Sequence, residues 1–284
     1  MKKQQLFTLF FVFFCAFSFS QTKEDVAKIT KNYDVEKIQQ KITYFQKLEE
    51  TEKAKAIEAA NKNGWPIFIK GENGSIQQLM KLTPDGFPIY YSTTNVNAAI
   101  STRANYLNAG GGLGLSLDGQ GMVARVWDGG TTRRTHSGFG GRVTTIDDVS
   151  GTTYSDHATH VTGTILALPW NAGAAGVKGM ASQATARTFN WDSDEAEALS
   201  EVLLGMLISN HSYGVPIGTG TSTLPAWYIG AYTEDARGWD EIAYLSPYYL
   251  PVMSAGNDGS NNNNSSPIAI GYDKLTGNKT SKNT

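Results

Sequence analysis

The stretch DHATHVTGTI, residues 156–165, places two histidines three positions apart among unusually small neighbours. Ser155 and Asp156 are residue types that cap helix N-termini, so we predict that a helix begins here with His157 in its first turn. The positive end of a helix dipole disfavours a protonated imidazole, which keeps this side chain neutral and able to accept a proton near neutral pH. Small residues that let the helix pack closely on a sheet are Ala158, Thr162 and Gly163. The stretch therefore predicts a helix that packs on a sheet and presents a candidate base.

The sequence around this helix alternates short apolar runs with helical patterns from about residue 106 onward. Segments with this pattern are GMVARVWDGG (121–130), EAEALSEVLLGMLISNHSYG (195–214) and YLPVMSAGNDG (249–259). We interpret the first and last as strands ending in Asp128 and Asn257, and the second as a helix running into a strand that carries Asn210 near its end. Strands that alternate with helices form parallel sheets, whose carboxyl ends meet at one edge. The predicted fold class is therefore α/β, a parallel sheet flanked by helices, with three polar side chains at one edge.

The region before residue 106 has a different composition. Residues 23–63 are charge-dense, lack Gly and Pro, and carry apolar residues at three- and four-residue steps, which predicts one or two amphipathic helices. Residues 65–92 alternate apolar runs with turn residues at 72–74 and 84–86, which predicts strands joined by hairpins. We therefore expect a small α+β module over residues 21–105 ahead of the main domain at 106–284. It contains no catalytic constellation that we can name.

The N-terminus has the three parts of an export signal: a basic start, a short Phe-rich apolar stretch and small residues near Ser20. The apolar stretch is shorter than the ~20 residues that span a bilayer, so a membrane anchor is the weaker interpretation. Residues 1–20 are thus expected to be a cleaved signal peptide. The mature protein would then be secreted, extracellular or periplasmic, with no membrane contact. The only cysteine, Cys15, lies inside that signal, so no disulfide or thiol chemistry is expected.

Composition excludes some classes of protein. The chain has 284 residues, of which 40% are hydrophobic and 18% charged, which is typical of a globular protein with a normal core. Of its 24 basic residues, Lys2 and Lys3 leave with the signal, so 22 remain against 26 acidic ones. This acidic balance argues against a nucleic-acid partner.

The polar residues in these segments are more informative together than singly. An Asp before two glycines or an Asn in a Gly-rich turn is by itself a turn residue, and a His-x-x-His pair is more often structural than catalytic. In chain order, however, Asp128, His157 and Asn257 supply an orienting carboxylate, a general base and an amide donor for an oxyanion. That combination predicts a hydrolytic site.

The same segments resemble a known family. VARVWDGG (123–130), HATHVTGTI (157–165), NHSYG (210–214) and VMSAGNDG (252–259) are similar, in this order, to the aspartate, histidine, substrate-strand and oxyanion segments of subtilisin-like serine proteases. The resemblance spans roughly residues 106–271. It implies the family's parallel-sheet fold and cleavage of polypeptide substrates. The N-terminal module would fit the family's prosegment, although it does not match the common prosegment motif, and a plain structural extension is the alternative.

The resemblance also implies roles for single residues. Asp128 would hold the ring of His157, which would accept the proton of the nucleophile, and the Asn257 side chain would donate to the oxyanion. The substrate-binding residues would be Asn210, Ser212, Tyr213 and Gly214, the last three forming an edge strand that pairs with the substrate backbone. His160 and His136 would be structural. No cofactor is required, no metal ligands can be assigned, and a structural calcium ion is compatible with the family.

The sequence departs from the family pattern in three ways. Ala158 replaces the usual Gly after the histidine, and Gly129 replaces the usual Ser or Thr after the aspartate. More seriously, the nucleophilic serine is absent: no segment of the Gly-Thr-Ser-Met-Ala type and no Gly-x-Ser-x-Gly elbow is found, and Ser254 and Ser281 have the wrong neighbours. We therefore expect the sequence to be part of a longer protease whose serine lies downstream, so that this chain by itself is inactive and its sheet incomplete.

Two other functions remain open. A catalytically inactive module that binds peptides would also fit an intact substrate strand without a nucleophile. A metal-dependent hydrolase with His157, His160 and Asp128 as ligands is the weakest reading, because metalloprotease helices space their histidines four apart with a Glu between. The sequence does not indicate an oligomeric state or a cleavage preference.

Overall fold

The structure is a computed structural model. It describes residues 22–70, 76–93, 107, 114–147, 154–169, 178–219, 222–257 and 275–284. The predicted signal peptide with Cys15, the turn at 72–74 and the expected boundary near residue 105 lie outside these residues. Within the described residues, no helix is long and apolar enough to cross a membrane.

A parallel sheet forms the centre of the molecule. Its strands, in spatial order, are β11 (Leu250–Met253), β7 (Ile208–His211), β4 (Val123–Asp128), β6 (Thr185–Asn190) and β5 (Val143–Thr145). Every pairing is parallel, which confirms the fold class predicted from the alternating pattern. Asp128 at the end of β4 is in register with Asn190, and Trp127 with His211. The carboxyl ends of the three middle strands therefore meet at one edge.

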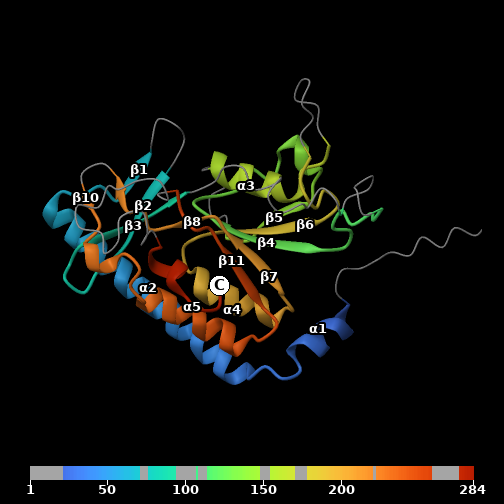
Figure 1. The fold of residues 1–284 in the computed structure, drawn as a ribbon, viewed down its shortest axis with the longest axis horizontal. Helices are drawn as coiled ribbons and strands as arrows, with labels where there is room; N and C mark the ends of the chain where they lie inside the picture. Colours follow the sequence, from blue (N-terminus) through green and yellow to red (C-terminus); the bar gives the residue numbers. More distant parts are fainter. Residues whose placement is uncertain are drawn as a thin grey trace, which may run out of the picture.

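Helices cover both faces of this sheet (Figure 1). One face packs against α4 (Asp194–Leu203) and α5 (Glu234–Leu245), and the long helix α2 (Val35–Asn63) lies against α4. This layer holds the main core, in which Trp127 stacks on Phe189 with ring centroids 4.3 Å apart. The other face packs against α3 (Asp156–Leu166) and the short 3-10 helix η2 (Ser137–Phe139).

The N-terminal module has the predicted α+β composition. It consists of α1 (Lys23–Thr30), α2, and the antiparallel strands β1 (Phe68–Lys70), β2 (Ile76–Leu82) and β3 (Pro88–Thr93). Gly64 ends α2 at φ +71 and Gly86 occupies the turn between β2 and β3 at φ +85, conformations that favour glycine. The predicted turn at 84–86 is thus confirmed.

The module and the main domain share a second sheet. Its order is β1-β2-β3-β8, and β8 (Tyr213–Gly214) comes from the segment that follows β7. Ser92 pairs with Gly214 and Thr93 with Tyr213 in antiparallel register. The remaining short elements are β9 (Gly218–Thr219), β10 (Ser222–Thr223), η4 (Ala226–Tyr228) and η5 (Gly277–Thr280).

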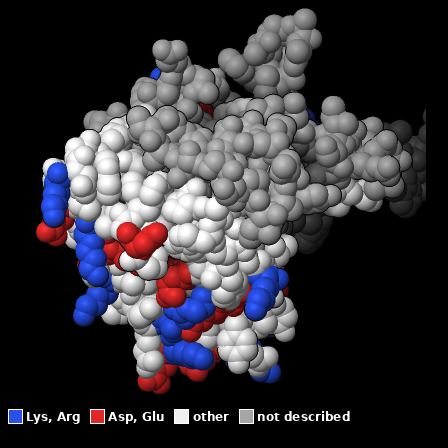
Figure 2. All heavy atoms as spheres, turned by 60° about the vertical axis from the view of Figure 1, so that its left-hand side comes forward, with Lys and Arg blue, Asp and Glu red and all other residues white. Residues whose placement is uncertain are grey.

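Ion pairs join the module to the domain. Lys81 on β2 pairs with Asp235 on α5, and both side chains are largely buried. Lys41 on α2 pairs with Glu241 on α5 at 2.8 Å. Figure 2 shows Lys and Arg side chains interspersed with Asp and Glu on the lower part of one face, with no large area of a single sign. The two parts are therefore held together by paired charges as well as by the core.

One predicted element is shorter than expected. The last strand, β11, ends at Met253, so the prediction that it extends to Asn257 is wrong. Gly256 has a φ of +96, which a strand cannot continue through, and the chain leaves the sheet before it. Asn257 therefore lies in a loop beyond the sheet edge.

Candidate active site

Asp128 is the last residue of β4 and its side chain is 1% exposed. Its Oδ1 accepts a hydrogen bond from the backbone N–H of Gly129 at 2.8 Å. The residue after the aspartate thus contributes a backbone donor, which needs no side chain. Burial raises the pKa of Asp128 from its ordinary value, and the hydrogen bonds from His157 and Gly129 oppose that rise.

His157 lies in the first turn of α3, as the capping residues predict. Ser155 is the N-cap, and its hydroxyl accepts a hydrogen bond from the N–H of Ala158 at 3.1 Å. The ring Nδ1 of His157 lies 2.8 and 3.0 Å from the two carboxylate oxygens of Asp128. A carboxylate at Nδ1 favours the tautomer with the proton on that nitrogen, which leaves Nε2 as the acceptor.

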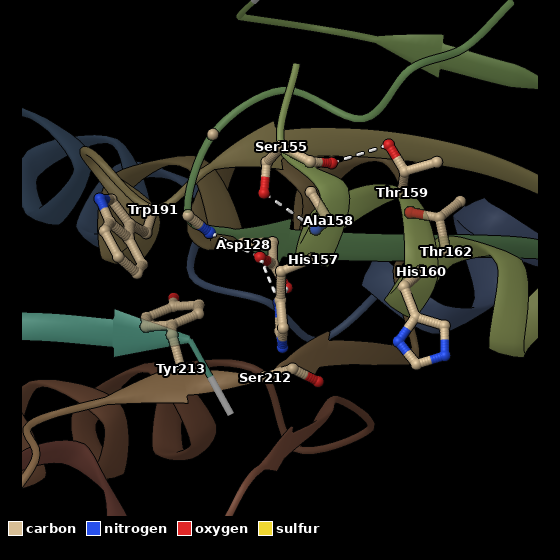
Figure 3. Close-up of polar contacts among 12 residues, drawn as sticks. Asp128, Ser155, His157, Ala158, Thr159, His160, Thr162, Trp191, Ser212 and Tyr213 are labelled. Atoms are coloured by element: carbon tan, nitrogen blue, oxygen red, sulfur yellow. Dashed lines mark hydrogen bonds and ion pairs between the residues drawn. The ribbon is translucent and has the colours of Figure 1, made fainter. Parts of the chain in front are cut away.

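The second ring nitrogen of His157 has no hydrogen-bond partner in the part of the chain that the structure describes. His157 Nε2 is buried, and no described residue forms a hydrogen bond with it. In Figure 3 this nitrogen points away from Asp128 and toward Ser212, which precedes β8. Buried polar atoms are nearly always paired, so this unpaired nitrogen on an imidazole held by a carboxylate makes His157 a candidate reactive residue.

The predicted substrate segment passes below this nitrogen. Ser212 accepts a hydrogen bond from the Asn210 amide at 2.9 Å, and Tyr213 and Gly214 form β8. Asn210 thus orients Ser212 from the side of β7. Because β3 pairs with β8, this segment already has an antiparallel strand along its outer edge. The sequence predicts an edge strand here but does not reveal this neighbour.

A buried polar network lies behind β8, and no motif in the sequence indicates it. The Tyr213 hydroxyl donates to Asp194 Oδ2 at 2.5 Å and lies 2.8 Å from Nδ1 of His211. The other ring nitrogen of His211 lies 2.7 Å from the Ser209 hydroxyl, which also contacts Tyr249. Burial lowers the pKa of His211 to about 3 and raises that of Asp194 to about 7. The network thus fixes β8 with an uncharged histidine, a hydroxyl and a carboxyl group drawn from separate parts of the chain.

Asn257 lies in the loop after β11, and no described contact joins it to the Asp128–His157 pair. Its side chain is exposed, four residues after β11 ends. The backbone N–H of Ser254 donates to the carbonyl of His211 at 3.0 Å, which keeps the start of this loop beside the end of β7. Asp128 and His157 are thus in direct contact, whereas no contact described in this structure joins Asn257 to them.

The other histidines have separate surroundings. His160 is exposed and points away from His157 (Figure 3). Both His160 and His136 line a cavity of about 430 Å³ between α3 and η2. His136 caps η2, because its Nδ1 accepts a hydrogen bond from the N–H of Gly138 at 3.1 Å. Among the described residues, no group of three or more His, Cys, Asp or Glu side chains could hold a metal ion.

The fold and this pair of residues define an α/β protein with a carboxylate-held histidine at the carboxyl edge of a parallel sheet. The chain belongs to the subtilase family, whose model (Peptidase_S8) matches residues 131–273, half of its length. The matched region includes His157, the substrate segment and Asn257, and it begins three residues after Asp128.

Comparison with solved structures gives weaker likenesses. The patellamide maturation protease PatA is 22% identical, over 48% of this chain and 49% of that one, with a TM-score of 0.34. The prenylagaramide maturation protease PagA is 20% identical, over 48% and 46%, with a TM-score of 0.33. The chain thus spans about half the length of these structures. No curated protein sequence matches it.

Proposed function

We propose that the complete protein is a secreted serine endopeptidase that hydrolyses peptide bonds. The observation that carries this proposal is the buried Nε2 of His157, which has no partner among the described residues and is presented by the Asp128 carboxylate at Nδ1. The nucleophilic serine is expected downstream of Thr284. Membership of the subtilase family supports the proposal.

The chemistry follows from the two nitrogens. His157 Nε2 would accept the hydroxyl proton of the serine as its oxygen attacks the carbonyl carbon of the substrate, and Asp128 would stabilise the imidazolium. The Asn257 amide would donate to the oxyanion of the tetrahedral intermediate. His157 would then return the proton to the leaving amine, so that an acyl-enzyme forms and water later hydrolyses it.

Covalent labelling of the full-length protein tests this mechanism. A phosphonofluoridate should label a single serine downstream of Thr284, and His157→Ala should abolish both labelling and casein cleavage. His160→Ala is the matched control, because its side chain points away from the site and the variant should remain active. Casein cleavage without labelling would refute the mechanism, and peptide binding without turnover would favour the inactive peptide-binding module.

We infer further that the N-terminal module is a prosegment. The pairing of β3 with β8 supports this, because the module then occupies the backbone groups that a substrate would use. Removal should expose β8, so the mature chain should begin between residues 94 and 122, after β3 and before β4. Terminal sequencing of the exported enzyme checks this, and a mature N-terminus that retains β3 would contradict it. The same experiment on the unprocessed precursor tests cleavage of the signal near Ser20.

A further inference from the structure

A small acidic cavity of about 50 Å³ lies between the N-terminal module and the main domain. Helices from both parts contribute carboxylates to its lining: Glu49 and Glu52 from α2, Asp194 and Glu195 from α4, and Glu234 and Asp235 from α5. Lys81 of β2 is the single basic side chain among the described residues that line it. Six carboxylates therefore share this interface cavity with one ammonium group.

The basic side chains around the cavity are already paired. The pairs are Lys81 with Asp235, Lys53 with Asp192, and Arg237 with Glu234. Asp235 is only 8% exposed, and its Oδ2 is buried without a hydrogen bond from any described residue. Lys55 is exposed, and of the neighbouring charges it has the smallest effect on Glu52. Four carboxyl groups are thus left without an ion-pair partner among the described residues: Glu49, Glu52, Asp194 and Glu195.

Burial raises the pKa of each of these four carboxyl groups. For Asp194, the pKa rises from an ordinary value of 3.8 to about 7. The backbone N–H of Ser193 donates to Glu49 at 2.6 Å, which opposes the rise of the pKa there. The carboxylate of Glu195 lies directly against α5, because a Cβ built on Gly238 would come within 2.1 Å of its Oε1. In the assembled protein, these groups therefore hold protons at a pH at which a hydrated carboxyl group has lost its own.

The tyrosines, the histidine and the lysine beside the cavity keep one charge state through the neutral range. Burial raises the pKa of Tyr91, Tyr213 and Tyr228, so their hydroxyls stay uncharged. His211, behind Tyr213, stays neutral because burial lowers its pKa to about 3. Burial lowers the pKa of Lys81 less than its negatively charged neighbours raise it, so the ammonium group keeps its charge. The four carboxyl groups are therefore the ones that respond to pH.

We propose that this cavity is a pH-sensitive switch: the module stays docked while the carboxyl groups that line the cavity are protonated, and it is released as they ionise at higher pH. The inference rests on the proposed role of the module as a prosegment. Ionised carboxylates confined together repel one another and lack water, whereas separation of α2 from α4 and α5 hydrates them. Docking therefore takes up protons, so it is most favourable at low pH and weakens as the pH rises.

The test uses the full-length precursor with His157→Ala, which prevents self-cleavage, and with a recognition site for an added protease inserted between β3 and β4. After cleavage at that site, the dissociation constant of the module is measured between pH 5 and pH 8. Proton uptake by Asp194 alone should raise it roughly 50-fold from pH 5 to pH 7, and the other groups should add to this change.

Two variants test which groups are responsible. Glu52→Gln/Glu195→Gln replaces two of the carboxyl groups by uncharged groups of similar size, so the module should bind more tightly at pH 8 and depend less on pH. The matched control is Glu58→Gln, which changes an exposed carboxylate on the same helix α2 and should follow the natural profile.

A dissociation constant that does not change between pH 5 and pH 8 would overturn the switch. A Glu52→Gln/Glu195→Gln variant with the natural pH dependence would overturn it as well. If that variant does not fold, Glu49→Gln takes its place, because it keeps an acceptor for the Ser193 N–H. The assay needs no catalysis, so a flat profile leaves the protease function standing. Absence of both phosphonofluoridate labelling and casein cleavage would instead overturn the proposed function.

Discussion

Replacing Lys81 by methionine should weaken the attachment of the N-terminal module more than any surface change. Lys81 and Asp235 form an ion pair across the interface, with 15% and 11% of their side chains exposed. Burial tends to lower the pKa of Lys81, but Asp235, Tyr228 and Glu52 raise it further, so its charge is maintained. The second oxygen of Asp235 is buried without a hydrogen bond from any described residue. In Lys81→Met, that carboxylate would lose its only described cationic partner.

The magnitude follows from this burial. Removing one partner of a buried pair costs about 3–5 kcal/mol, which corresponds to a factor between about 10² and 10⁴ in an equilibrium constant. Replacing both partners by apolar residues is often neutral, so the double variant Lys81→Met/Asp235→Leu should regain most of the loss. Lys53→Met is the matched control, because its pair with Asp192 is more exposed, at 25% and 33%, and should contribute about 1 kcal/mol or less.

Urea unfolding of the chain, followed by tryptophan fluorescence, measures these changes. Trp191 is a local reporter, because its indole N–H donates to Gln78 of the module at 2.8 Å. The reasoning would be refuted if Lys81→Met lowered the free energy of unfolding no more than Lys53→Met does. It would also be refuted if the double variant lost as much free energy of unfolding as its two single variants lose in sum.

Three further outcomes are expected. In the full-length enzyme, Asp128→Asn should lower kcat by roughly 10⁴-fold with little change in KM, measured by steady-state peptide cleavage, because the Nδ1 proton of His157 loses its carboxylate; a small loss would contradict the assigned role. Burial raises the pKa of Glu197 to about 9, so the folded chain holds a proton that the unfolded chain loses near pH 4.5. The free energy of unfolding should therefore fall as pH rises from 4.5 to about 9. In the Glu197→Gln variant, the midpoint of urea unfolding should change less with pH across that range. Ile38→Ala, at a fully buried position of α2, should cost about 2–5 kcal/mol in urea unfolding, whereas Val35→Ala at 50% exposure should cost far less; equal losses would show that α2 is not packed as described.

Local patterns in the sequence predicted the parts of the site that depend on neighbouring residues. Ser155 caps α3 and thereby places His157, and the apolar run before Asp128 forms the buried strand β4. The contact between Asp128 and His157 follows from the parallel sheet and the helix start together. These features could be predicted because each depends on residues a few positions apart.

Other features depend on residues far apart in the chain. The Tyr213 hydroxyl meets Asp194, which on the sequence is only one of three acidic residues in the first turn of α4. Lys279 lies in a short polar stretch with no helical or strand period, and its place between Gly214 and Gly256 depends on the whole fold. The strand β11 ends at Met253, and the conformation of Gly256 beyond it, with a φ of +96, is not indicated by the apolar pattern before it.

The pairing of β3 with β8 has a consequence for how the two parts of this gene can evolve. The β-ladder between Ser92–Thr93 and Tyr213–Gly214 is made by backbone groups, which every residue except proline supplies in full. Substitutions in β3 can therefore accumulate without loss of the pairing, provided that the strand stays extended and avoids proline. The region around His157 has no such freedom, because its contacts are made by particular side chains. A family model built from shared sequence is then expected to match the domain and to leave the module unmatched, as the span of residues 131–273 does.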